Sequence, residues 1–146
     1  MAYMLLIVEP PEQRGTRTRE EGQQAYARMQ RFADELKAQG LLLGVESLAS
    51  LNQASRVQVR DGRTRVVDGP FAEAKEMVGG FFLVDCATRD EALAIAGRCP
   101  AAEWCTVEVR SLAPCYDDST RCEMGPGDAA GAASPVDRRP VRSSCA

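Results

Sequence analysis

The chain has 146 residues, 45% of them hydrophobic, and a formal net charge of -3. This length fits one domain, and neither sign of charge forms the long block that attracts a protein to phosphate backbones, so we expect no direct contact with nucleic acid. The sequence has no histidine, which removes the commonest general base near neutral pH and the commonest metal ligand. We therefore expect no metal site and no cofactor.

The first apolar run, residues 4–8, is too short to cross a bilayer and lacks the flanks of a secretory signal. We therefore expect a cytoplasmic protein with no membrane partner. None of the cysteines forms the C-x-x-C pair typical of zinc sites, and in a reducing compartment they would be free thiols. We expect Cys86, Cys99 and Cys105 to have a packing role. For Cys115, Cys122 and Cys145, reversible oxidation is an alternative.

The first predicted element is a strand over residues 2–8, which Pro10 and Pro11 end. Its nearly unbroken apolar composition is typical of a strand buried on both faces. A helix follows, because Thr18 and Glu21 have the spacing of a capping box. An apolar stripe of Ala25, Met29, Phe32 and Leu36 recurs at helical spacing, and Gly40 ends the helix.

Residues 41–48 predict a second strand. Residues 56–60 then alternate in polarity and are followed by Asp61-Gly62, the strongest short hairpin signal. Residues 63–67 would form the returning strand of this hairpin. We expect an inserted β-hairpin here. Its arginines either mark a docking surface for an acidic partner or keep an exposed hairpin from pairing with other chains.

Residues 81–86 predict another buried strand, entered through Gly79-Gly80. Thr88 and Glu91 predict a second capping box ahead of a helix that ends before Pro100. Alternation over residues 106–112 predicts a last, half-buried strand.

This order predicts an α+β, ferredoxin-like βαββαβ fold with an inserted β-hairpin over residues 1–113. Two helices cover only one face of such a sheet. The other face keeps apolar positions, and the same face of a second copy would cover it, so we expect a homodimer. Residues 114–146 have few large apolar side chains, and we expect a mostly disordered tail.

The segment DGPFAEAKE at residues 68–76, followed by GGFF at residues 79–82, resembles the signature of the DGPF group of YCII-related proteins. The opening YMLLI and the closing VEVR fit the same pattern, so the resemblance covers residues 1 to about 113. It implies a dimeric α+β barrel with a ligand cleft near the DGPF turn. Asp68 matches the Asp of the His and Asp pair of relatives, whereas this chain has no histidine.

Two interpretations of this segment are open. In the functional one, Asp68 is a catalytic base or ligand acceptor, Lys75 binds an anionic group, and Glu73 and Glu76 tune the charge. In the structural one, Asp68 forms a turn, Phe71 fills the core, and the charged residues form a solvated turn.

Two functions are therefore compatible with the sequence. The resemblance implies a ligand-sensing or accessory protein linked to an extracytoplasmic-function sigma factor, and the missing histidine favours it. The alternative is a cofactor-free enzyme, of isomerase, lyase or dehalogenase type, acting on a small anionic or cyclic substrate in a cleft near Asp68. The carboxylate-rich DGPF loop favours this alternative.

Overall fold

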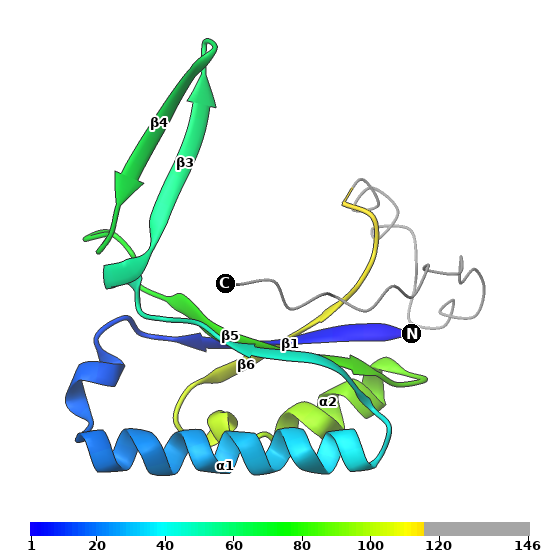
Figure 1. The fold of residues 1–146 in the computed structure, drawn as a ribbon. Coiled ribbons are helices and arrows are strands. Elements are labelled where there is room, and N and C mark those ends of the chain that lie inside the picture. Colours follow the sequence, from blue (N-terminus) through cyan, green and yellow to red (C-terminus); the bar gives the residue numbers. More distant parts are fainter. Residues whose placement is uncertain (116–146) are drawn as a thin grey trace.

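Four strands form one antiparallel sheet in the order β2-β5-β1-β6 (Figure 1). The structure is a computed structural model that describes residues 1–115. From residue 116 onward, the expected disordered tail lies outside the described residues. The strands are β1 (Ala2–Glu9), β2 (Leu42–Ser47), β5 (Met77–Asp85) and β6 (Thr106–Ser111).

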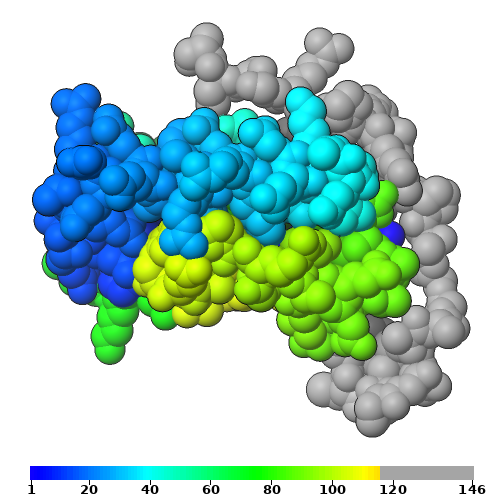
Figure 2. All heavy atoms as spheres, turned by 90° about the horizontal axis from the view of Figure 1, so that it is seen from below, coloured from blue at the N-terminus to red at the C-terminus, as the bar shows by residue number. Residues whose placement is uncertain are grey.

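Two helices, α1 (Arg19–Ala38) and α2 (Arg89–Arg98), cover one face of this sheet (Figures 1 and 2). A separate hairpin of β3 (Ser55–Arg60) and β4 (Arg63–Asp68) stands on the side away from the helices (Figure 1). The predicted ferredoxin-like α+β fold with an inserted hairpin is therefore confirmed. Residues 1–115 also form three short 3-10 helices, η1 (Gln13–Thr16), η2 (Leu51–Gln53) and η3 (Pro100–Glu103).

The predicted capping box begins α1. The Glu21 backbone N–H donates to Thr18 Oγ1 over 3.1 Å, and the Thr18 N–H donates to the Glu21 carboxylate over 2.8 Å. The helix ends at Ala38, and the predicted stop, Gly40, follows the C-cap Gln39 with a φ of 72° in the left-handed region. Within residues 1–115, no helix combines the length and the apolar character needed to cross a membrane.

The cap of α2 is only half of the predicted box. The Glu91 N–H donates to Thr88 Oγ1 over 3.2 Å, as expected. The Glu91 carboxylate, however, accepts from the Ala87 N–H over 2.7 Å and not from Thr88. The carboxylate therefore binds one residue further back than the predicted box.

The core lies between the sheet and the helices. Phe32 of α1 and Phe82 of β5 meet edge to face, with ring centroids 5.2 Å apart. Burying aromatic side chains of this size contributes roughly 2 kcal/mol each or more. The other buried members of this core cluster are Tyr3, Leu5, Ile7, Leu36, Val84, Cys86, Ala92, Ile95, Ala96, Cys99 and Ala101.

The first strand is buried on one face only in a single copy, and not on both faces as its composition predicted. Alternate residues from Tyr3 to Glu9 face the helices and are buried, whereas those between them are half-buried. The register places Leu6 beside Phe81 and Met4 beside Leu83. The sheet therefore keeps an apolar stripe on its helix-free face, made of Met4, Leu6, Val8, Val78, Phe81 and Leu83, which we call the open face.

The hairpin has the turn that Asp61-Gly62 predicted. Both turn residues have positive φ, 52° and 72°, as a type I′ turn requires. Every residue of both strands is exposed. Paired residues share a face, so one face of the hairpin is largely apolar (Val57, Val59, Thr64, Val66), and the other has four arginines (Arg56, Arg60, Arg63, Arg65).

The last buried strand begins four residues earlier than predicted, at Met77 in place of Phe81. Gly79 and Gly80 lie inside β5 and do not precede it. A Cβ on Gly80 would lie 2.7 Å from the Glu46 carbonyl oxygen of β2. These glycines therefore mark a close approach of neighbouring groups within the sheet, which sequence alone does not distinguish from a loop.

Candidate functional site

Asp68, the predicted base or ligand acceptor, is the last residue of β4 and is exposed. Its Oδ1 accepts a hydrogen bond of 2.6 Å from the Ser55 hydroxyl, directly opposite in the hairpin register. This contact joins the two strands where the hairpin leaves the body of the domain. A role in holding the hairpin accounts for the observed contact.

The other predicted site residues, Glu73, Lys75 and Glu76, are all exposed. Glu73 pairs with Arg56 of the hairpin at 3.1 Å. Within residues 1–115, neither Lys75 nor Glu76 has a hydrogen bond or ion pair to Asp68. The contacts of Asp68 and Glu73 are therefore with residues of the hairpin, Ser55 and Arg56, and not with the other predicted site residues.

The neighbouring residues of the DGPF turn have structural contacts. A Cβ on Gly69 would collide with the backbone carbonyl oxygen of Leu51, so this position requires glycine. Phe71 is buried, and the Arg56 guanidinium lies 3.7 Å from its ring centroid. The peptide bond between Gly69 and Pro70 is cis. These contacts attach the hairpin to the segment that follows it.

A sizeable hollow lies elsewhere, between α1 and the β2 and β5 side of the sheet. It is a cleft with a volume of about 760 Å³, within the usual size range of small-molecule sites. Its apolar walls include Ile7, Met29, Val45, Phe82 and Trp104. Three carboxylates and three guanidinium groups also line it, namely Glu9, Asp34 and Glu46, and Arg14, Arg17 and Arg19.

Glu9, at the end of β1, brings a buried carboxylate to this cleft. Only 4% of the residue is exposed, and among residues 1–115 it is the one buried charged residue. Burying a carboxylate is costly unless it is paired. The partner is Arg14 of η1, whose Nε donates to Glu9 Oε1 over 2.7 Å and whose Nη2 lies 2.7 Å from the same oxygen.

Arg14 also holds two other strand ends. Its Nη1 donates to the Leu48 carbonyl oxygen just after β2 over 2.7 Å. Its Nη2 donates to the Gly79 carbonyl oxygen of β5 over 3.2 Å. A Cβ on Gly79 would collide with Glu9 Oε1 and lie 2.8 Å from Arg14 Nη2, so the absent side chain leaves room for the ion pair.

Trp104, which follows η3, forms another part of the cleft wall. The Arg17 and Arg28 guanidinium carbons lie 5.5 and 5.3 Å from the centroid of its ring, at cation–π distance. Gln13 Nε2 donates to the Trp104 carbonyl oxygen over 2.5 Å. The ring is therefore held in place by η1 and α1 together.

The cysteines within residues 1–115 have no bond to one another. Burial, and secondarily the nearby Glu9 carboxylate, raises the pKa of the Cys105 thiol from 9.0 to about 11. Burial is also the largest cause that raises the pKa of Cys99 and of Cys86. Thiols in this state are poor nucleophiles at neutral pH. No group of three or more acidic residues or cysteines in this part of the chain is placed to hold a metal ion.

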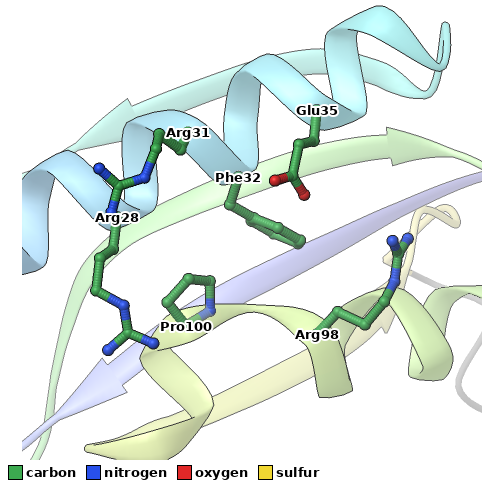
Figure 3. Close-up of a pocket in the computed structure, with 6 residues that line it drawn as sticks. All are labelled: Arg28, Arg31, Phe32, Glu35, Arg98 and Pro100. Atoms are coloured by element: carbon green, nitrogen blue, oxygen red, sulfur yellow. The ribbon is translucent and has the colours of Figure 1, made fainter.

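A smaller hollow of about 180 Å³ lies between α1 and the end of α2 (Figure 3). Arg28, Arg31 and Arg98 line it together with Glu35. Arg28 is already paired with Glu103 through two hydrogen bonds of 2.9 Å, and in Figure 3 the Arg31 side chain points away from Arg98. The guanidinium groups that line this smaller hollow therefore do not converge on one point.

The family model of the YCII-related domain matches residues 1–115 of this chain. The chain belongs to the YCII-related domain family. An uncharacterized protein of Rhizobium meliloti (strain 1021) is 34% identical over 115 residues, which cover 77% of this chain and 93% of that protein. The YCII-related domain thus accounts for the whole of the described fold, and the resemblance predicted from DGPFAEAKE is confirmed.

Glu9 and Arg14 of this YCII-related domain were not predicted as site residues from the sequence. Glu9 lies between an apolar run and two prolines, where a carboxylate is expected to be exposed at a strand end. Two weak signals were present. Glu9 continues the alternation that buries Tyr3, Leu5 and Ile7, and a Gly-Gly pair inside a strand indicates close approach of other groups.

Proposed function

We propose that this protein binds a small organic ligand in the cleft between α1 and the sheet, and that it acts as a ligand-sensing or accessory protein. The single observation that carries the proposal is a buried, paired carboxylate at one end of a cleft with apolar walls. Small-molecule sites combine such walls with a few fixed polar groups. Glu9 supplies the polar group, and Val45, Phe82 and Trp104 supply apolar surface.

The charges of the cleft favour a ligand of low net charge. Its carboxylates and guanidinium groups are equal in number. A cleft with balanced charges gives little electrostatic attraction to strongly charged molecules. The ligand class that fits is therefore an aromatic or aliphatic body with a small polar end.

An enzyme centred on Asp68 is less well supported. Asp68 is exposed, hydrogen bonds to Ser55 and does not line the cleft. A base acts within hydrogen-bond reach of a bound substrate. The contacts of Asp68 instead suit a residue that holds the hairpin, which favours binding over catalysis.

The proposal includes a homodimer formed through the open face. This face has six neighbouring apolar side chains that the helices of the same copy do not cover. The hairpin stands on the same side of the sheet (Figure 1), and its exposed valines Val57, Val59 and Val66 add to the apolar surface available to a second copy. Unless a partner covers them, both surfaces expose apolar area to water, which is unfavourable.

The proposed partner of the ligand-sensing function is an extracytoplasmic-function sigma factor in the cytoplasm. The resemblance to the DGPF group supports this partner. The four arginines on one face of the hairpin offer a cationic surface for an acidic segment of such a protein. Replacing Arg60, Arg63 and Arg65 by Gln should weaken the complex in a titration of the two purified proteins, and unchanged affinity would exclude the arginine face as the contact.

A thermal-shift screen of small organic compounds tests ligand binding. A ligand at about 100 times its dissociation constant should raise the unfolding free energy by roughly 2.7 kcal/mol. Ala25→Phe places a ring in the cleft and should abolish the shift. Gln24→Phe adds the same ring to an exposed position outside the cleft and should leave the shift intact. Equal responses of both variants would place the ligand elsewhere.

A further inference from the structure

The two oxygens of the Glu9 carboxylate have different surroundings. Oε1 receives the Arg14 Nε donor over 2.7 Å. No side-chain or backbone donor within residues 1–115 bonds to Oε2. In that part of the chain the one fully enclosed side-chain oxygen without a partner is Gln13 Oε1, so Oε2 of Glu9 is not sealed inside the protein. Glu9 lines the cleft, so the cleft is the route by which a donor from outside the protein would reach Oε2.

Protein oxygens already face all three nitrogens of the Arg14 guanidinium. Its Nε donates to Glu9, its Nη1 to the Leu48 carbonyl oxygen and its Nη2 to the Gly79 carbonyl oxygen. Since Nη2 also lies 2.7 Å from Glu9 Oε1, these contacts use four of the five N–H groups. An anionic ligand beside Arg14 would also be repelled by the Glu9 carboxylate.

We infer that Glu9 Oε2 accepts a hydrogen bond from a hydroxyl or ammonium group at the inner end of the cleft ligand. This inference rests on the proposed ligand-binding function. A carboxylate that is nine-tenths buried gains more from a donor than an exposed one, because water competes less for it. A hydrogen bond to a charged group is also stronger than one between neutral groups. The cleft should therefore prefer donor-bearing ligands to carboxylic acids with the same apolar body.

The sequence-based expectation of an anionic ligand placed Lys75 as the binding cation. Lys75 does not line the cleft. The cleft cations that are not bound to Glu9 are Arg17, which lies over Trp104, and Arg19 at the start of α1. Of the charged residues that line the cleft, the buried one is instead the acceptor, Glu9.

Three probes with one phenyl body test the inference: 2-phenylethanol, 2-phenylethylammonium and 3-phenylpropanoate. Their dissociation constants for the full chain can be measured by NMR titration. The alcohol and the ammonium should bind about tenfold more tightly than the propanoate, the effect of one charge-assisted hydrogen bond. A preference for the propanoate, or equal affinities, would overturn the inference.

The Glu9→Gln variant sharpens the test. Its amide oxygen can still accept from Arg14, which places an NH₂ donor where Oε2 was. The order of the probes should then reverse, so that the propanoate binds more tightly than the ammonium. Glu46→Gln makes the same chemical change at an exposed residue of the cleft and should keep the original order. An unchanged order in Glu9→Gln would also overturn the inference.

The outcomes separate this inference from the proposed function. If all three probes bind equally and Ala25→Phe blocks them, the cleft binds ligands but Glu9 does not select them. If none of the probes or screened compounds binds in the cleft, the proposed function itself is wrong. Should Glu9→Gln fail to fold, the order of the three probes on the unmodified chain still decides for or against the role of Glu9.

Discussion

Arg14 Nε donates a 2.7 Å hydrogen bond to Glu9 Oε1, and this contact joins a guanidinium whose side chain is 33% exposed to a carboxylate that is 4% exposed. The two residues are only five positions apart, because η1 turns the chain back over the end of β1. The same guanidinium reaches strands β2 and β5. The first prediction concerns what this pairing contributes to stability.

Arg14→Met keeps a long apolar stem and removes the charge. The buried Glu9 carboxylate then has no cation, and the unfolding free energy should fall by about 3 kcal/mol. Urea denaturation followed by circular dichroism measures the change. Arg28→Met removes an exposed ion pair with Glu103 and should cost clearly less. Equal losses of unfolding free energy in the two variants would show that the buried Glu9–Arg14 pair stabilises the fold no more than the exposed Arg28–Glu103 pair.

Gly79→Ala tests the space that the ion pair occupies. A methyl group at this position would collide with Glu9 Oε1 and approach Arg14 Nη2, so the variant should lose about 2 kcal/mol of stability. Gly22→Ala, inside α1 with no atom near the added methyl, should instead gain up to about 1 kcal/mol from helix propensity. Thermal unfolding of the two variants and the unmodified chain measures both changes in stability. A Gly79→Ala variant as stable as the unmodified chain would contradict the close approach of Glu9 and Arg14 to this position.

Asp68→Asn and Asp68→Ala distinguish a turn residue from a site residue. Asn can still accept the Ser55 hydrogen bond, whereas Ala cannot, so Asn should cost little and Ala up to about 1 kcal/mol. Ser55→Ala should cost about as much as Asp68→Ala, and the double variant should add nothing further.

Ligand binding in the cleft should not change in Asp68→Asn or in Lys75→Met, because neither residue lines it. Loss of the thermal shift in both variants, with the fold intact, would place the ligand beside Asp68. That result would support the site predicted from DGPFAEAKE over the cleft at Glu9.

Cys105 predicts a pH dependence of stability. Its pKa is about 11 in the folded chain, above the ordinary 9.0, so the folded state keeps the proton at pH values where the unfolded state releases it. Stability should therefore be full below pH 9 and should decline as the pH rises from about 9 to about 11. Cys105→Ala should lessen this decline in urea titrations across the range. An identical slope in the variant would contradict the assignment to Cys105.

The open face predicts a dimer that a charge can disrupt. Light scattering behind a sizing column should give twice the chain mass at micromolar concentration. Leu6→Glu places a carboxylate in the middle of the open face and should yield a monomer. Leu93→Glu places the same group on the exposed side of α2 and should leave the mass unchanged. A monomeric unmodified chain would refute the dimer.

The parts of the fold that sequence predicted well are those set by neighbouring residues. Thr18 with Glu21 fixes the start of α1, Gly40 ends it, and Asp61-Gly62 forms a type I′ turn, since each depends on local backbone geometry. The family resemblance had the same local origin, because DGPFAEAKE is one continuous segment.

The candidate site could not be predicted because it depends on residues distant in the chain. Glu9 is buried because Gly79, 70 positions later, has no side chain to occupy its place. The cleft depends on the distance between α1 and β2, which no local pattern encodes. Conversely, Asp68 stood out in the sequence for its setting in a recognisable turn, whereas its hydrogen bond to Ser55 is a cross-strand contact of the hairpin.

The contacts of Arg14 also make a prediction about how relatives diverge. One guanidinium satisfies a carboxylate of β1, a carbonyl after β2 and a carbonyl of β5, and it fits only where residue 79 is glycine. A change at position 9, 14 or 79 alone leaves a buried charge unpaired or two groups in collision. The three positions should therefore change together among relatives. Relatives should either retain Glu, Arg and Gly at all three positions or replace all three, and relatives with a single replacement should be rare.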